Sequence, residues 1–386
     1  MRLRLLFAAA FLIISSFALS DADQFENPRV QWMKGKYGIM VHWLYPYFGG
    51  DVDEIVGGFN IDTFVSDFES SGAEWLIFTA GQNTGAYCSP NKALEMYCGE
   101  SHTPKKRDLL LEVASRVKKL GKRFIVYIPC EVRGNKSVRE DLAWIDGCAD
   151  PKTEFQKRWV EILREWSLRL GKLCDGWWVD GSYEDVAPHL EWEMWHSALR
   201  AGNPDAAVTF NPGLLQRGRA VVLHPDHDYT AGEVSFLVNG EIETSFSKGE
   251  NSNAFLPKTA YYTPTKTLWH ALIPIDSFWA AYSNWPDDWL RLPKHWKPFD
   301  SQKLRKVRPP LYSENELFKF ASAFTGRGGA VTFNIGIYEN GKLSDESVEL
   351  VKKVGKRLVH AEKYKRPSRL KSRAFQLDAY FYCQDR

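Results

Sequence analysis

The chain has 386 residues, of which 44% are hydrophobic and 25% charged, and its formal net charge is +2. These values are ordinary for a globular protein. They argue against a nucleic-acid or anionic-membrane partner, which would require a basic excess or patch. Aromatic residues are abundant, with 15 Trp, 16 Tyr and 23 Phe, and their flat faces suit either a large core or a sugar-binding cleft.

Residues 1–20 have the pattern of a secretory signal peptide. Two arginines precede an apolar run from Leu5 to Leu19, and small residues follow at the cleavage positions. The run is short for a membrane-spanning helix, and no basic stop follows it. We therefore expect a secreted or periplasmic protein with no membrane association after cleavage; a retained amino-terminal anchor is the alternative.

Export makes disulfide bonds possible. Of the six cysteines, Cys88 and Cys98 bracket a short loop and are the first candidate pair, and Cys130 and Cys148 are the second. Sequence alone does not determine the connectivity. The sequence contains no C-x-x-C, so the zinc and redox motifs of that type are absent.

Strand and helix patterns alternate along the rest of the chain. Phe64 and Phe68 share one face of a helix, and Pro151 and Gly171 mark the two ends of another. In chain order we expect strand 37–43, helix 61–71, strand 74–79, a polar loop over 81–104, helix 107–120, strand 123–128, helix 151–170, strand 176–180, helix 188–201, strand 207–210, short strands at 228–233 and 267–273, helix 317–324, strand 330–334 and helix 344–359.

This alternation predicts βαβ units around a parallel sheet. Eight such units that close on themselves form a TIM-type (β/α)8 barrel, and the length suits one with long loops. A doubly wound open sheet is the alternative, disfavoured because no glycine-rich phosphate turn follows the first strand. We expect the barrel to span residues 21–362 and residues 363–386 to form a tail or an edge element.

The stretch from Gly176 to Gly181 leads an apolar strand directly into a carboxylate. Such runs normally avoid a carboxylate, because burying one without a partner is costly. Side chains alternate along a strand, so Trp178 and Asp180 share one face. Barrels carry their chemistry at the carboxyl ends of strands, and we expect Asp180 to act on a substrate there. The alternative is an aspartate that caps the next helix or turn.

Cleavage of a glycosidic bond requires a second carboxyl group, which protonates the leaving oxygen or activates water. Glu233 is the leading candidate, because the small residues before it let a substrate approach. Glu131 lies just past the third strand, and Glu241 and Glu243 lie in the loop after Glu233. These three glutamates are the rivals.

From about residue 31 to about residue 358, the chain resembles the retaining α-L-fucosidases of glycoside hydrolase family 29. The nucleophile segment and the closing segment are the most specific parts of the likeness. The matching segments lie at 36–43, 71–75, 106–109, 177–181, 228–233, 333–336 and 340–342.

The resemblance implies a role for individual residues. Asp180 corresponds to the nucleophile and Glu233 to the acid/base, which must keep its proton near neutral pH. His42 is placed at the sugar hydroxyls, and Trp43 and Tyr127 line the pocket. A retaining mechanism further requires the two carboxyl groups to lie about 5 Å apart.

One segment departs from the family pattern. Where these fucosidases carry His-His-Asp after the second strand, this chain has Gln82 and Asn83 followed by Thr84. Amide side chains still donate and accept hydrogen bonds, but they carry no charge. We expect Gln82 and Asn83, together with Trp178, to contact the substrate, which is fucose or a related sugar.

The sequence therefore predicts an exported retaining glycosidase that releases a terminal α-L-fucose or related sugar from a glycan, without metal or cofactor. One alternative is a carbohydrate-binding barrel without catalysis, suggested by the missing histidine pair. Another is a glycosidase of the same fold that acts on a different sugar. A third is a metal-assisted hydrolase that uses the segment from His224 to Asp228, which we interpret instead as the loop into the Glu233 strand.

Overall fold

The structure is a computed structural model that describes residues 26–44, 50–144, 152–215, 222–243, 255–262, 264–276 and 306–365. The predicted signal peptide, the chain beyond residue 365, Cys148 and Cys383 lie outside these residues. In the described part, no helix is both long and apolar enough to cross a membrane.

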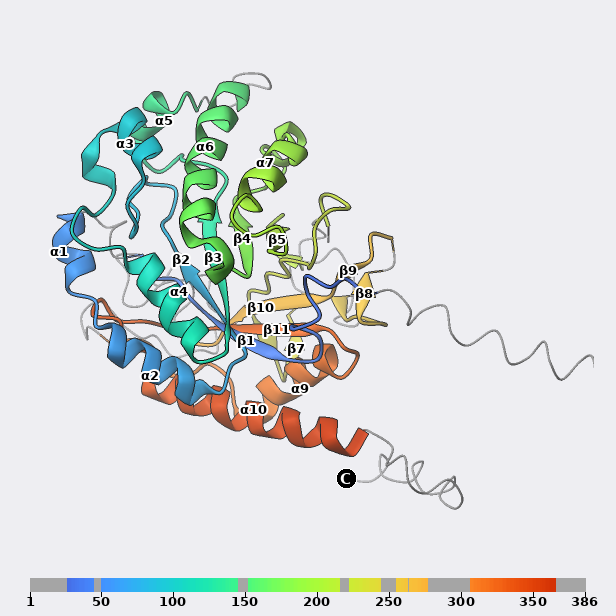
Figure 1. Ribbon diagram of the computed structural model, residues 1–386. Helices are drawn as coiled ribbons and strands as arrows, with labels where there is room; N and C mark the ends of the chain where they lie inside the picture. Colours follow the sequence, from blue (N-terminus) through green and yellow to red (C-terminus); the bar gives the residue numbers. More distant parts are fainter. Residues whose placement is uncertain are drawn as a thin grey trace, which may run out of the picture.

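A curled sheet of seven parallel strands forms the centre of the molecule (Figure 1). Each strand pairs in parallel with its neighbours; Ile39, for example, pairs with Leu76 on one side and Phe333 on the other. In spatial order the strands are β10 (His270–Pro274), β11 (Ala330–Asn334), β1 (Tyr37–Val41), β2 (Trp75–Thr79), β3 (Arg123–Pro129), β4 (Gly176–Asp180) and β5 (Ala207–Phe210).

The gap between β5 and β10 is bridged by the irregular segment 228–234. The backbone N–H of Asp228 donates to Val208 in β5, and parallel bridges join Tyr229 to Leu268 and Glu233 to Leu272. The segment therefore occupies the sixth strand position. The expected (β/α)8 barrel is confirmed, with an irregular segment in place of the sixth strand.

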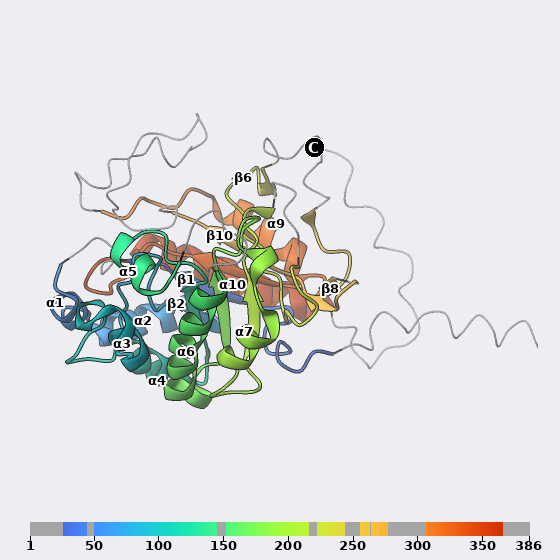
Figure 2. The ribbon, with the colours of Figure 1, turned by 90° about the horizontal axis from the view of Figure 1, so that it is seen from above.

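Helices surround the strands (Figure 2). Their starts follow local capping rules: Asn60 accepts the Thr63 N–H at the start of α2, and Ser313 and Glu316 form a capping box before α9. The larger helices are α2 (Ile61–Ser71), α4 (Leu109–Lys119), α6 (Lys152–Leu170), α7 (Trp192–Leu199), α9 (Glu314–Thr325) and α10 (Asp345–Lys365).

Two separate cores lie on the two faces of the barrel strands. The larger core fills the space between strands and helices and contains Trp177, Val179 and Phe210. The smaller core fills the barrel interior and contains Tyr127 and Trp178. The alternation predicted for β4 is therefore confirmed, because Trp177 and Trp178 point in opposite directions.

The structure corrects some boundaries in the loops. Three short helices occupy segments for which no helix was predicted: α1 (Val52–Gly57), α3 (Lys92–Cys98), which lies within the expected polar loop 81–104, and α5 (Lys136–Asp141). Each begins at an Asp or Asn whose side chain accepts a backbone N–H of the first turn. Such short helices depend on their caps and tertiary contacts more than on apolar periodicity, so the sequence pattern missed them.

The predicted pair between Cys88 and Cys98 is wrong, since both are free thiols. Cys88 is buried, and its Sγ donates to the carbonyl of Thr79 at 3.6 Å, whereas Cys98 ends α3. Cys130 is also free, and its predicted partner lies outside the described residues. The sulfur atoms that bracket the loop therefore belong to different environments.

Candidate active site

Polar side chains from several strand ends meet in one small cavity at the carboxyl end of the barrel. The cavity has a volume of about 220 Å³. It brings together the sequence-predicted residues His42, Gln82, Asn83, Tyr127, Trp178, Asp180 and Glu233, and it is also lined by Met40, Glu131, Tyr183 and Asn211.

Asp180 and Glu233 face each other across the side chain of Asn211. The Asn211 Nδ2 donates to Oδ1 of Asp180 at 2.9 Å and to Oε2 of Glu233 at 2.6 Å. Because both oxygens bond the same nitrogen, their separation cannot exceed the sum of these two distances, 5.5 Å. Two carboxyl groups from different strand positions therefore lie across one small space.

Asp180 receives hydrogen bonds on both carboxylate oxygens. Besides Asn211, the Tyr127 hydroxyl donates to Oδ2 at 2.5 Å and the Tyr183 hydroxyl to Oδ1 at 3.3 Å. Burial, together with the negative charge of Asp180, raises the pKa of Tyr127 well above its ordinary value. The phenol therefore stays protonated, and the hydrogen bond that it donates orients the carboxyl group of Asp180.

A polar chain extends from this carboxylate to the residues that replace the histidine pair. Gln82 Nε2 donates to the Tyr127 hydroxyl and lies 3.4 Å from Nε2 of His42. Asn83 Nδ2 donates to Oε1 of Glu131 at 2.8 Å. Gln82 therefore positions His42 and Tyr127 next to Asp180, and Asn83 positions Glu131, the rival acid/base candidate.

Glu131 is more deeply buried than either member of the facing pair. Its side chain is 8% exposed, and burial raises its pKa above the ordinary value, although hydrogen bonds from the Arg133 backbone and Asn83 oppose the shift. A carboxyl group that holds its proton is what a general acid requires, so Glu131 remains a rival to Glu233 on that criterion. Glu233, in contrast, shares the donor Asn211 Nδ2 with Asp180.

Two aromatic residues differ in position. Trp178 stacks on Tyr127 with ring centroids 5.4 Å apart and forms one wall of the cavity. Trp43 packs instead against Phe59 and Phe78 in the helix-facing core, and its Nε1 donates to the carbonyl of Glu339. The expectation that Trp43 lines the cavity is therefore wrong, because the residue after His42 points to the opposite side.

The remaining rival carboxylates lie elsewhere. Glu241 is in the short strand β7 (Glu241–Ile242) and accepts from Lys319 at 2.8 Å on the surface. Neither Glu241 nor Glu243 is among the described residues that line the cavity. Sequence reasoning missed Asn211 and Tyr183. Asn211 directly follows β5 and Tyr183 lies three residues after the end of β4, and a position just past a strand end was the available signal.

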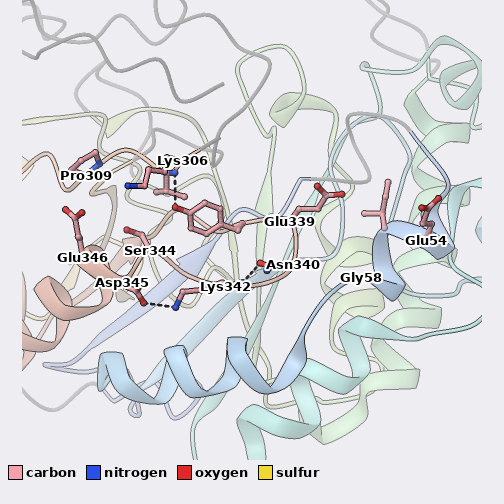
Figure 3. Close-up of a pocket in the computed structure, with 13 residues that line it drawn as sticks. Glu54, Gly58, Lys306, Pro309, Glu339, Asn340, Lys342, Ser344, Asp345 and Glu346 are labelled. Carbon is pink, nitrogen blue, oxygen red and sulfur yellow. Dashed lines mark hydrogen bonds and ion pairs between the residues drawn. The ribbon is translucent and has the colours of Figure 1, made fainter. Parts of the chain in front are cut away.

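A larger hollow of about 840 Å³ opens among the segments that follow β1, β10 and β11. Figure 3 shows its polar lining, including the ion pair between Lys342 and Asp345 at 2.7 Å. Among the described residues that line it, neither Asp180 nor Glu233 occurs. The larger hollow therefore lies at the same end of the barrel but does not contain the facing carboxylates.

Metal-ligating side chains gather away from the cavity. In the described part of the chain, the group with suitable spacing is His196, His224 and Asp226. None of these three lines the cavity that holds Asp180.

Comparison with known proteins gives a family and a fold. The family model described as Alpha-L-fucosidase matches residues 15–275. Among solved structures, an endo-fucoidan hydrolase of glycoside hydrolase family 107 has a TM-score of 0.61 at 16% identity, covering 87% of this chain and 95% of that one. Three further family 107 chains are covered over 53%, 54% and 64% of their length.

Two solved fucosidases show a similar fold. Alpha-L-fucosidase isoenzyme 1 from Paenibacillus thiaminolyticus has a TM-score of 0.53 at 16% identity, over 87% of this chain and 76% of that one. AlfC from Lactobacillus casei, in complex with its alpha-L-fucose product, has a TM-score of 0.52 at 14% identity, over 87% and 100%. No curated protein matches the chain.

Proposed function

This chain belongs to the alpha-L-fucosidase family and is a glycoside hydrolase, and from that premise we propose that it releases a terminal α-L-fucose, or a closely related sugar, from a glycan with retention of anomeric configuration. Asp180 acts as the nucleophile and Glu233 as the acid/base. The single observation that carries this proposal is the shared hydrogen bond of Asn211 to both carboxylates.

In the first step, Asp180 attacks the anomeric carbon and forms an ester with the sugar while the glycosidic C–O bond breaks. Glu233 gives its proton to the departing oxygen, so the leaving group departs as a neutral alcohol. In the second step, water attacks the same carbon, Glu233 takes a proton from it, and Asp180 is released as a carboxylate.

The separation of the carboxylates favours this route over single displacement. Retaining glycosidases hold their two carboxyl groups about 5–5.5 Å apart, and inverting enzymes about 6.5–9.5 Å apart to admit a water molecule. The facing oxygens of Asp180 and Glu233 are at most 5.5 Å apart. This upper bound matches the retaining class.

The cavity supports a single sugar ring as the unit recognised. The ring of Trp178, stacked on Tyr127, forms part of the apolar lining of the cavity, and the apolar side of a sugar ring can pack against such a wall. His42, Gln82 and Asn83 lie around the same space and offer hydrogen-bond donors and acceptors to hydroxyl groups. Because Gln82 already bonds His42 and Tyr127, it also links substrate recognition to the orientation of Asp180.

The second candidate function is cleavage of internal bonds in a fucose-containing polymer, in place of release of a terminal sugar. The 840 Å³ hollow at the same end of the barrel offers room for further sugar units, and the fold covers 95% of an endo-fucoidan hydrolase. Product analysis separates the two activities: an exo-enzyme yields monosaccharide from the first turnover, whereas an endo-enzyme yields oligosaccharides first. The amino-terminal pattern supports export to the periplasm or the medium as the place where such glycans are met.

The proposal is tested with aryl glycosides of fucose, galactose, arabinose and rhamnose compared side by side. We expect the fucoside or one close relative to be cleaved, and Glu233→Gln to lower kcat/KM about 10²–10⁴-fold. The loss should be smaller for an activated aryl leaving group, which needs little protonation. Glu131→Gln is the matched comparison. A large loss in Glu131→Gln with none in Glu233→Gln would transfer the acid/base role to Glu131.

A further inference from the structure

A cluster of histidines lies on the outer side of β5, opposite the cavity. His196 belongs to α7, and His224 and His227 belong to the segment that leads into residues 228–234. Phe210 stacks on His227 with ring centroids 5.2 Å apart, and Phe210 lies in the helix-facing core. The next residue, Asn211, lines the cavity. The cluster is therefore separated from the facing carboxylates by the wall of the barrel.

Three side chains of the cluster have the spacing of metal ligands. One ligand atom from each of His196, His224 and Asp226 lies within 4.8 Å of the others. Oδ2 of Asp226 is 3.9 Å from Nδ1 of His196 and 3.8 Å from Nδ1 of His224. Zinc bonds of about 2.0–2.1 Å place tetrahedral ligand atoms about 3.3 Å apart, so shifts of well under one ångström would bring each of these two His–Asp pairs to ligand spacing, and the ligand atoms of the two imidazoles lie within 4.8 Å of each other.

The buried imidazole of His196 provides a second, independent observation. Its residue is only 5% exposed, yet neither of its ring nitrogens has a hydrogen-bond partner among the described residues. The Nε2 of His227, 3% exposed, is also without a partner in the described part of the chain. A buried polar group left without a partner destabilises the folded state. Coordination of a metal would give one of the two ring nitrogens of His196 a partner.

The side chains around Asp226 leave its carboxylate free to bind an ion. Asp226 is 61% exposed, so an ion has access from solvent. The neighbouring Arg200 donates from its guanidinium to Asp228 at 2.7 Å and to the backbone carbonyl of Asp226 at 3.3 Å. Its charge is thus paired mainly with Asp228. His224 Nδ1 accepts a 3.3 Å hydrogen bond from the Asp226 N–H, and its Nε2 is the alternative ligand atom.

We propose that His196, His224 and Asp226 bind a divalent transition metal of the zinc class, with water completing the coordination. Two imidazoles and one carboxylate are ligands that Zn²⁺ accepts in tetrahedral sites. The ion joins α7 to the connection between β5 and the sixth strand position. It stabilises the outer layer of the barrel and takes no part in the hydrolysis.

The competing interpretation is an aromatic cluster of neutral histidines without an ion. Trp192 stacks on His224 with centroids 5.5 Å apart, and it also contacts His227 edge to face. Packing of this kind stabilises the cluster whether or not a metal is present. The test must therefore detect the ion itself and its coordination.

The test uses full-length protein without a histidine tag, stripped with a chelator and dialysed at pH 8, where ordinary histidines are neutral. We measure Zn²⁺ binding by calorimetry, the melting temperature against Zn²⁺ concentration, and the visible spectrum after Co²⁺ addition. We expect one Zn²⁺ per chain, a melting temperature that rises with Zn²⁺, and a Co²⁺ spectrum typical of tetrahedral coordination.

The decisive variant is His224→Asn combined with Asp226→Asn, because both side chains are partly or largely exposed and their loss is compatible with folding. Binding should weaken by more than about 100-fold, since even changes behind the ligands cost about 10–100-fold. The matched control combines His102→Asn with Asp205→Asn and should bind Zn²⁺ as the wild type does. Equal binding by both double variants, or no Zn²⁺ binding by the wild type, would overturn the site. Loss of glycoside hydrolysis per folded protein in the decisive variant would overturn its structural role.

Discussion

The inner and outer faces of β4 and β5 differ sharply, because adjacent residues of each strand end lie on different faces: one lines the polar cavity and the next packs in the core. On the inner face, Trp178, Asp180 and Asn211 line a polar cavity. On the outer face, Trp177 and Phe210 pack beneath α6 and α7 in the larger core. Because successive side chains of a strand point to opposite faces, one pair of strands supports both the reaction centre and the scaffold. Substitutions on the two faces should therefore separate activity from stability.

The largest expected effect is on the inner face. Asp180→Ala should lower kcat/KM at least about 10³-fold, because the covalent route loses its nucleophile, while the melting temperature changes little. Asp185→Asn is the matched control, since Asp185 is exposed and pairs with Arg133. The measurement is steady-state hydrolysis of the preferred aryl glycoside beside a thermal melt. Retention of wild-type turnover by Asp180→Ala would break the assignment of the inner face.

Trp177→Ala tests the outer face of the same strand. Trp177 is 1% exposed, and loss of such a side chain typically costs about 3–5 kcal/mol of unfolding free energy. We expect that loss in urea denaturation, with kcat of the folded protein within about threefold of the wild type. A full loss of kcat at unchanged stability would show that the two faces are not independent.

Asn211→Ser sharpens the role of the bridge between the carboxylates. A shorter side chain cannot reach both Asp180 and Glu233, so the hydrogen bonds that hold their relative position are lost. We expect kcat to fall about 10–100-fold, with a changed pH profile and a smaller change in KM. A fall confined to KM would assign Asn211 to substrate binding instead.

The smallest expected effect is the contribution of Glu131 to the pH dependence of the protein's stability. Burial raises the folded pKa of this carboxyl above its unfolded value. Its contribution to stability is therefore full below the unfolded pKa and is lost as pH rises through the folded pKa. Glu131→Gln should thus gain stability relative to the wild type as the pH increases from acid toward neutral. Thermal melts across that range check the sign, and a difference that stays constant with pH would contradict it.

The sequence predicted the regular parts of this molecule and its strand-end chemistry. Strands 176–180, 207–210 and 330–334 were predicted with their observed bounds, because buried apolar runs with turn residues at their ends leave little ambiguity. Seven of the eight predicted site residues meet in one cavity. Their chemical roles remain predictions that the kinetic experiments decide.

The failures have local physical causes. Trp43 was placed in the pocket although alternation from His42 would have pointed it outward, where it packs on Phe59. Asn211 was overlooked because a lone amide after a strand carries no composition signal. His196, whose ring nitrogens have no hydrogen-bond partner in the described part of the chain, lies in α7, away from the segment that holds His224, so folding brings these metal-ligand candidates together.

The stereochemistry of the first product tests the central claim most directly. Hydrolysis of the preferred aryl α-glycoside is followed by proton NMR from the first minute, before the free sugar equilibrates between its anomers. Because the facing oxygens of Asp180 and Glu233 lie at most 5.5 Å apart, we expect the α-anomer to form first. Initial accumulation of the β-anomer would show single displacement and contradict the roles given to Asp180 and Glu233.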